Sequence, residues 1–196
     1  MFLAKLQVPL ASVRNSYELH RIIWNFFPNM PDADRFFLFR VNYDQRDQKT
    51  IEILVQSELE PIASGKGSSI LLAKKAYNPH FRKGQVLKFE VRTNPVRRST
   101  SRETKKQVYR LIEDDTELET WFKNLLLPMA DLLNFRIVSK DKLLFRTKRQ
   151  EEGMIYTVSF EGYLVVSDPE LLFSTVKNGI GRAKSFGCGL LSVARP

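Results

Sequence analysis

Two side chains that can transfer protons lie three residues apart near the amino terminus. Tyr17 and His20 occur in SYELHRIIWNFF, where Ser16 suits the N-cap of a helix predicted over 17–27. Positions three apart share one face of a helix, here at the border between the apolar stripe and the polar side. An imidazole that titrates near pH 6.5 suits general acid–base catalysis, and a tyrosine hydroxyl can orient or donate a proton. The same pattern also marks partly buried packing residues, so both interpretations stay open.

A glycine-rich segment near the carboxyl terminus could approach an anion. GIGRAKSFGCG combines glycine with Arg182, Lys184 and Ser185. Glycine lets successive backbone N–H groups come close to a phosphate, whose charge a lysine could neutralise. The segment follows a predicted helix and lacks a closing GK[ST], so it is neither a dinucleotide fingerprint nor a Walker loop. A tight helix-to-strand connection and a phosphate contact are equally compatible with it. The glycines are Gly179, Gly181, Gly187 and Gly189.

Positive charge dominates the chain and gathers in two further stretches. Lys and Arg number 31 against 22 Asp and Glu, which gives a net charge of +9 and a sequence pI near 9.7. Such a field favours polyanions, with nucleic acid first among them. Either basic stretch alone is explained by a solvated surface, but the two together favour nucleic acid. The candidate RNA-binding residues in them are Arg97, Arg98, Arg102, Lys105, Lys106, Lys148 and Arg149.

The composition argues against several other classes of protein. One cysteine and two histidines provide neither an internal disulfide nor a zinc-type ligand cluster, so we expect chemistry without a metal or a cofactor. The apolar run at the amino terminus is short and interrupted by Lys5, so it does not resemble a signal peptide. No stretch approaches the roughly 20 apolar residues of a membrane span. We expect a soluble, cytoplasmic protein without a membrane partner.

The predicted elements repeat one order in both halves of the chain. The first half reads strand, helix, strand, strand, a short irregular or helical piece, and strand. This order predicts an α+β protein of tandem ferredoxin-like (RRM-like) domains, each with an antiparallel sheet and helices on one face. The expected units are a first domain over 1–94, a basic linker over 95–105 and a second domain over 106–196. Expected strands cover 2–10, 35–43, 50–57, 85–93, 106–112, 135–139, 142–148, 154–166 and 190–194, and the later helices cover 116–134 and 169–177.

Several motifs resemble one family. GIGRAKSFGCGLLSVARP is similar to the carboxy-terminal glycine-rich motif of the CRISPR RNA-processing endoribonucleases, in the form typical of the CasE branch. YELHRIIWNFFPNMPDADRFFLFRV resembles the amino-terminal part of the same branch, in which a helix bearing Tyr and His precedes a Phe-Pro turn and a strand. FEVRTNPV and VSFEGYLVVSDP match its internal landmarks in order. The resemblance spans nearly the whole chain.

The resemblance implies a specific reaction and specific partners. Members of the family bind the stem-loop of a CRISPR repeat and cut at its 3′ base without metal, leaving a 2′,3′-cyclic phosphate. Many then stay on the product hairpin beside the other subunits of Cascade, so the expected partners are precursor and mature CRISPR RNA and those subunits. The family's catalytic histidine corresponds to His20, its helix tyrosine to Tyr17, its glycine-rich loop to 179–189 and its basic hairpin to the region of Lys148 and Arg149. A non-catalytic RNA hairpin-binding subunit is the alternative, and a general basic nucleic-acid protein is a third interpretation.

Overall fold

The structure is a computed structural model, and it describes residues 1–13, 16–28, 35–42, 49–63, 67–100, 107–146 and 152–196. The strands are β1 (Phe2–Pro9), β2 (Phe37–Asn42), β3 (Thr50–Ser57), β4 (Ile70–Ala76), β5 (Val86–Thr93), β6 (Val96–Thr100), β7 (Gln107–Leu111), β8 (Ala130–Arg146), β9 (Glu152–Val166) and β10 (Ser192–Ala194). The helices are α1 (Ser16–Trp24), α2 (Asp115–Leu126) and α3 (Pro169–Asn178), and the 3-10 turns are η1 (Leu10–Ser12) and η2 (Lys184–Phe186).

The first sheet has the strand order β2-β3-β1-β4, and all its neighbouring strands are antiparallel. This is the order of a ferredoxin-like domain, in which β3 separates the two strands that α1 connects. Buried residues alternate along the strands, so Leu6, Phe39 and Ile53 point to one face and pack against Ile23 of α1. The sheet and α1 therefore share one core.

The segment expected to be irregular or helical is a strand. β4 pairs with β1 from Phe2↔Ala76 to Gln7↔Ile70 and closes the first sheet at its edge. Its residues are almost all exposed, so the strand lacks the alternation of buried side chains on which the prediction depended.

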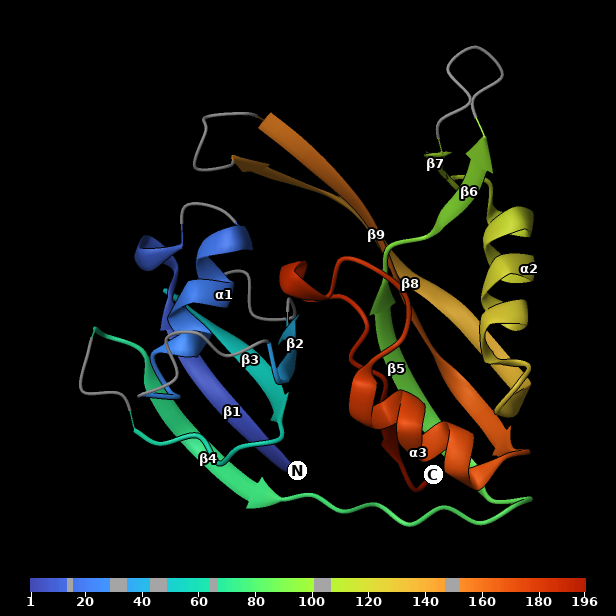
Figure 1. Cartoon of the computed structure of the whole chain (residues 1–196), viewed down its shortest axis with the longest axis horizontal. Coiled ribbons are helices and arrows are strands. Elements are labelled where there is room, and N and C mark those ends of the chain that lie inside the picture. Colours follow the sequence, from blue (N-terminus) through green and yellow to red (C-terminus); the bar gives the residue numbers. More distant parts are fainter. Residues whose placement is uncertain (14–15, 29–34, 43–48, 64–66, 101–106, 147–151) are drawn as a thin grey trace.

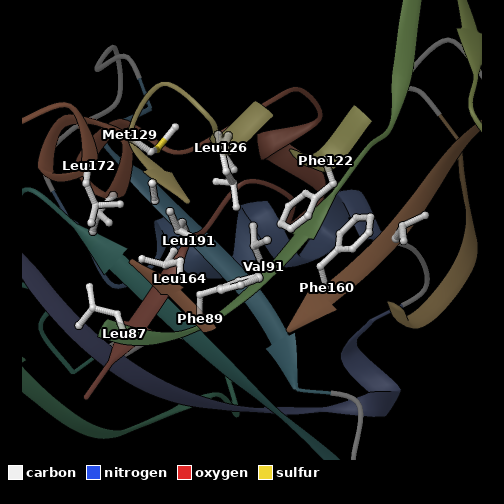
Figure 2. Close-up of a cluster of buried hydrophobic side chains, with 14 of the residues drawn as sticks. Leu87, Phe89, Val91, Phe122, Leu126, Met129, Phe160, Leu164, Leu172 and Leu191 are labelled. Carbon is white, nitrogen blue, oxygen red and sulfur yellow. The ribbon is translucent and has the colours of Figure 1, made fainter. Parts of the chain in front are cut away.

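The second sheet has the order β10-β5-β9-β8, again antiparallel, with α2 and α3 inserted as in a complete ferredoxin-like domain. Its core joins both helices to the sheet. The rings of Phe122 on α2 and Phe160 on β9 face each other in Figure 2. They are stacked, with centroids 4.0 Å apart. The predicted tandem ferredoxin-like, antiparallel α+β architecture is confirmed.

The strand expected to close the first sheet instead opens the second. β5 pairs with β9 over eight residues and with β10 over three. Its inward residues Leu87, Phe89 and Val91 lie in the same core as Phe122 and Phe160 (Figure 2). The expected assignment of the strand 85–93 to the first domain is therefore wrong, because alternation identifies a strand but not the sheet that it joins.

The region expected to contain a linker and the first strand of the second domain forms an additional hairpin. β6 pairs with β7 from Val96↔Leu111 to Thr100↔Gln107 as a separate two-stranded sheet. Within 95–105, residues 96–100 are therefore strand, and residues 101–105 lie outside the described part of the chain. In Figure 1 this pair of strands continues from the upper end of β5 and lies beside the upper end of α2.

The long helix expected over 116–134 is shorter in the structure. α2 ends at Leu126, and β8 runs from Ala130 to Arg146 as one strand with two register irregularities. It includes the expected strand 135–139 and residues 142–146 of the next one, and residues 147–148 lie outside the described part of the chain. Leu127 is still helical, with φ of −46° and ψ of −38°, but Pro128 has no backbone N–H with which to continue the helical hydrogen bonds, which explains the early end. Because β5 pairs only with Val158–Val165 of β9, the distal ends of β8 and β9 leave the sheet as a two-stranded arm, which we call the β8–β9 arm. Figure 1 shows this arm extending past α1.

Polar contacts hold the two sheets in a defined arrangement. The buried amide of Gln56 on β3 donates to the carbonyl oxygens of Val176 at 2.7 Å and Lys177 at 3.3 Å, near the end of α3. Arg40 on β2 forms an ion pair of 2.8 Å with Glu90 on β5. Among the helices in the described ranges, none has the length and apolar character to span a bilayer.

Candidate functional site

His20 lies on α1 in a half-buried, partly aromatic environment. Its ring centroid is 5.2 Å from that of Phe37 on β2 and 6.1 Å from that of Trp24, one turn further along α1. Burial lowers the pKa of His20, and the positive charge of Arg35 lowers this pKa further. Both effects favour the neutral imidazole, the form that can accept a proton. The backbone of Tyr17 lies in α1, but its side chain is outside the described part of the structure.

Arg35 connects the surroundings of His20 to the glycine-rich segment. It lies two residues before β2, and its Nη1 donates a hydrogen bond of 2.9 Å to Oγ of Ser185 in η2. Lys184, in the same turn, donates from Nζ to the carbonyl oxygen of Asn178 at 2.7 Å. Burial lowers the pKa of Lys184, and the charge of Arg35 lowers this pKa further. The structure thus brings two cations and an imidazole from distant parts of the chain together.

An open pocket of about 380 Å³ lies at this point. Arg35 lines it together with residues 181–186, which include Arg182, Lys184 and the hydroxyl of Ser185. In Figure 1, η2 is the short red turn between α1 and the second sheet, and η2 contacts both α1 and β2. Guanidinium, ammonium and hydroxyl groups around one pocket form a site that suits an anion such as a phosphate.

The glycines divide into those that allow close packing and one that lies open. Gly179 and Gly189 have φ of +78° and +88°, and a Cβ on either would lie within 3.0 Å of other atoms. The obstructing atoms are the Leu38 methyl groups on β2 for Gly179, and the Ile180 carbonyl oxygen for Gly189. Gly187, with φ of +82°, faces the Phe39 ring, whereas Gly181, with φ of +71°, has nothing within 4 Å of the added Cβ. A tight connection therefore explains Gly179, Gly187 and Gly189, and Gly181 lines the pocket.

The β8–β9 arm also contacts the glycine-rich segment. The ring of Phe145 on β8 lies 4.7 Å from the ring of Phe186 in η2. Gly153 on β9 leaves the space for this ring, because a Cβ there would lie 2.2 Å from Phe145 Cζ. The base of the predicted basic hairpin is thereby placed beside the pocket.

The predicted basic residues have different surroundings. Arg182 stacks on the ring of Tyr109 in β7, 4.1 Å from its centroid, and donates to its hydroxyl at 3.1 Å. Arg97 pairs with Glu117 on α2 at 2.6 Å, and Arg98 is exposed on β6. The structure therefore brings Arg182 to the pocket and places Arg97 in an ion pair with α2. Arg102, Lys105, Lys106, Lys148 and Arg149 lie outside the described residues.

Sequence reasoning missed Arg35 as a member of the site. It precedes the apolar strand FFLFRV in the chain and is 150 residues from Ser185, so no local spacing connects it to the glycine-rich segment. Arg35 belongs to the site only because η2 packs against α1 and β2. In the part of the chain that the structure describes, no group of three or more His, Cys, Asp or Glu residues is placed to hold a metal ion.

The chain is similar to proteins of one kind. The family model described as CRISPR associated protein matches residues 1–195. The chain is 32% identical over 201 residues to the CRISPR system Cascade subunit CasE of Escherichia coli strain K12, a match that covers 99% of each chain. It is 28% identical over 218 residues to the CRISPR-associated endoribonuclease Cse3 of Thermus thermophilus, covering 99% of this chain and 100% of that one. Among solved structures, CRISPR endoribonuclease Cse3 bound to a 19-nucleotide RNA is similar with a TM-score of 0.83 and 29% identity, over 99% of this chain and 100% of that chain.

Proposed function

Because the chain belongs to the CRISPR associated protein family, we propose that it is an endoribonuclease that processes CRISPR precursor RNA. The resemblance read from its motifs is confirmed by the match over residues 1–195. Similar proteins named as a Cascade subunit and as an endoribonuclease support this function. The observation that carries the proposal is the half-buried imidazole of His20, whose pKa is lowered beside a cationic pocket.

The proposed reaction uses the 2′-hydroxyl of the RNA as its nucleophile. The 2′ oxygen attacks the adjacent phosphorus at the 3′ base of the repeat stem-loop, and the bond from phosphorus to the 5′ oxygen breaks. The upstream fragment then ends in a 2′,3′-cyclic phosphate, and the downstream fragment begins with a 5′-hydroxyl. Both proton transfers can be made by side chains, so the proposed reaction proceeds without a metal ion.

His20 is the proposed general acid or base, and Tyr17 is proposed to assist it. A neutral imidazole can remove the proton from the 2′-hydroxyl, and a protonated one can supply the proton to the leaving 5′ oxygen. Such proton transfer is typically worth about 10² to 10⁴ in rate. Lys184 and Arg182 line the pocket and suit the negative charge that develops on the phosphate.

The remaining basic residues are proposed to bind the RNA stem. Arg98 on β6 is exposed, and Lys148 and Arg149 belong to the connection between β8 and β9. Contacts from such residues to phosphates give affinity that is largely independent of sequence and depends on salt. We further propose that the product hairpin stays bound beside other Cascade subunits.

Cleavage in the presence of EDTA tests the reaction. The protein is mixed with its cognate repeat RNA, and the ends of both fragments are identified. We expect a cyclic phosphate on the upstream fragment. A 3′-hydroxyl at this end, or no cleavage by a protein that binds the hairpin tightly, would contradict the proposal, and the second result would favour the non-catalytic hairpin-binding subunit.

The variant His20→Ala separates catalysis from binding. We expect cutting to be lost and hairpin affinity to be largely retained, because affinity depends on the phosphate contacts. Loss of both would identify His20 as a structural residue instead. Binding that does not depend on the hairpin sequence would favour a general nucleic-acid protein.

A further inference from the structure

The turn beside His20 has an unfavourable backbone and is held by contacts from other elements. Ala183, which precedes η2, has φ of +57° and ψ of +33°, in the left-handed region that is unfavourable for an alanine. Each residue of η2 then makes a contact outside the turn. Lys184 donates to Asn178 at the end of α3, Ser185 accepts from Arg35, and Phe186 packs against Phe145. The position of the turn therefore depends on contacts from several elements.

Arg35 donates a side-chain hydrogen bond from the first domain to this turn, which also packs against α1 and β2. Arg35 lies just before β2, and Phe37, the first residue of β2, packs against the ring of His20. Arg35 also lines the pocket formed by residues 181–186. One side chain thus borders His20 on one side and the anion-suited pocket on the other.

We propose that Arg35 is a positioning residue of this site, which holds the turn Lys184–Phe186 in register with His20 through its hydrogen bond to Ser185. The proposal rests on the endoribonuclease function proposed above, for which Lys184 and His20 must meet the same phosphodiester. The other contacts between the turn and the first domain are packing of η2 against α1 and β2, and the further polar contacts between the domains, at Gln56 and Arg40, lie outside the turn.

The guanidinium has a second effect on His20 through its charge. An arginine stays protonated even when burial lowers its pKa, as it does for Arg35. A permanent positive charge beside His20 penalises the imidazolium and so enlarges the fraction of neutral imidazole near pH 7. The pKa of Lys184 is lowered by the same charge.

The effect of Arg35 must be separated in any test from that of the other charged groups on α1 and on the elements packed against it. On α1 itself these are Glu18 and Arg21, and from η2 the charged group is Lys184. The β8 strand also contacts α1, but three of its charged residues are paired elsewhere: Lys140 with Asp115, Lys142 with Glu113, and Asp141 with Arg92. Among the described residues, the charge that lowers the pKa of His20 is that of Arg35.

Four variants separate the hydrogen bond from the charge. Arg35→Gln removes both, Arg35→Lys keeps the charge without the planar fork, and Ser185→Ala removes the hydrogen bond while leaving the charge. Arg21→Gln is the matched control, because it removes the same charge from the exposed side of the helix that bears His20. Circular dichroism and thermal unfolding show which variants are folded.

The first measurement is the titration of His20 in the free protein, followed by NMR. The chain has two histidines, and the exposed His80 provides an internal control signal. We expect the pKa of His20 to rise in Arg35→Gln and to be unchanged in Arg21→Gln. Because this measurement needs no RNA, it tests the effect of the Arg35 charge on His20 even if the wild-type protein proves unable to cut.

The second measurement is single-turnover cleavage as a function of pH. We expect Arg35→Gln to lower the rate by about tenfold or more with hairpin affinity changed by less than about threefold, and to move the His20-dependent limb of the profile to higher pH. Ser185→Ala should lower the rate without moving this limb, and Arg35→Lys should restore the limb but only part of the rate. Equal rates and equal His20 titrations in Arg35→Gln and Arg21→Gln would overturn the proposal. If Arg35→Gln does not fold, unchanged rates in both Arg35→Lys and Ser185→Ala would overturn it.

Discussion

Replacement of Gly189 by alanine tests whether the glycines of the segment 179–189 are needed for packing. At φ of +88°, an alanine there costs about 1–2 kcal/mol relative to glycine. Its Cβ would also lie 2.6 Å from the carbonyl oxygen of Ile180, a backbone atom. The backbone cannot easily move away, because Gly189 donates to the carbonyl oxygen of Arg92 at 2.7 Å and accepts from Ile180 N at 2.9 Å.

The expected loss combines a backbone cost with a steric cost. Forced overpacking of this kind typically costs about 1–3 kcal/mol. We therefore expect Gly189→Ala to lower the free energy of unfolding by about 2–5 kcal/mol, a large part of the roughly 5–15 kcal/mol of a typical domain. Gly181→Ala is the matched control, because it has a similar φ of +71° and nothing within 4 Å of the new Cβ. Only the backbone cost of about 1–2 kcal/mol should appear there.

Urea unfolding followed by circular dichroism measures both variants against the wild type. The slope of the free energy with urea should be unchanged, so that the midpoint reports stability. Equal losses for Gly181→Ala and Gly189→Ala would show that crowding is not what requires glycine at 189. The same two proteins also address function, because Gly181 lines the pocket. If RNA approaches the backbone there, Gly181→Ala should weaken cleavage by more than its small loss of stability explains.

Three further outcomes follow from the core, the domain interface and the site. Phe122→Ala should lower the free energy of unfolding by about 3–5 kcal/mol, measured by urea unfolding, because it removes a buried ring stacked on Phe160. Gln56→Leu should cost about 1–3 kcal/mol in the same assay, because the carbonyl oxygen of Val176 loses its buried donor. Because the pKa of His20 is lowered in the folded state, its contribution to stability should be complete above about pH 6.5 and lost as pH falls through the folded pKa. Unfolding of the wild type and of His20→Gln at several pH values measures this, and an equal pH dependence in both would contradict it.

The elements of the first sheet show how far local patterns determine structure. β3 was predicted at its observed bounds, and α1 and β2 were predicted within a few residues, because each buries one face and so has a periodic pattern. β4 was missed because an exposed edge strand has no such pattern. α3 was predicted from Asp168 and Pro169, and the carboxylate of Asp168 does accept from the backbone N–H groups of Glu170 and Leu171.

In the candidate site, too, features set by neighbouring residues were predictable and contacts between distant residues were not. His20 was identified from one helical turn and from the resemblance, and the structure places it beside the pocket formed by residues 181–186, with Arg35 common to both surroundings. Arg97 pairs with Glu117, a residue of α2 that its own sequence neighbourhood does not indicate, and its binding of RNA stays a prediction.

The sequence by itself determined the family, the type of most elements and the imidazole that can transfer protons, because these depend on residue types and on spacings of a few residues. Only the tertiary structure decided that β5 belongs to the second sheet, that Arg35 meets Ser185, and that three of the four glycines allow close packing. Each of these depends on contacts between segments far apart in the chain. Such contacts depend on how whole sheets and helices pack together. They produce no periodic pattern in the sequence of either segment, so local spacing does not predict them.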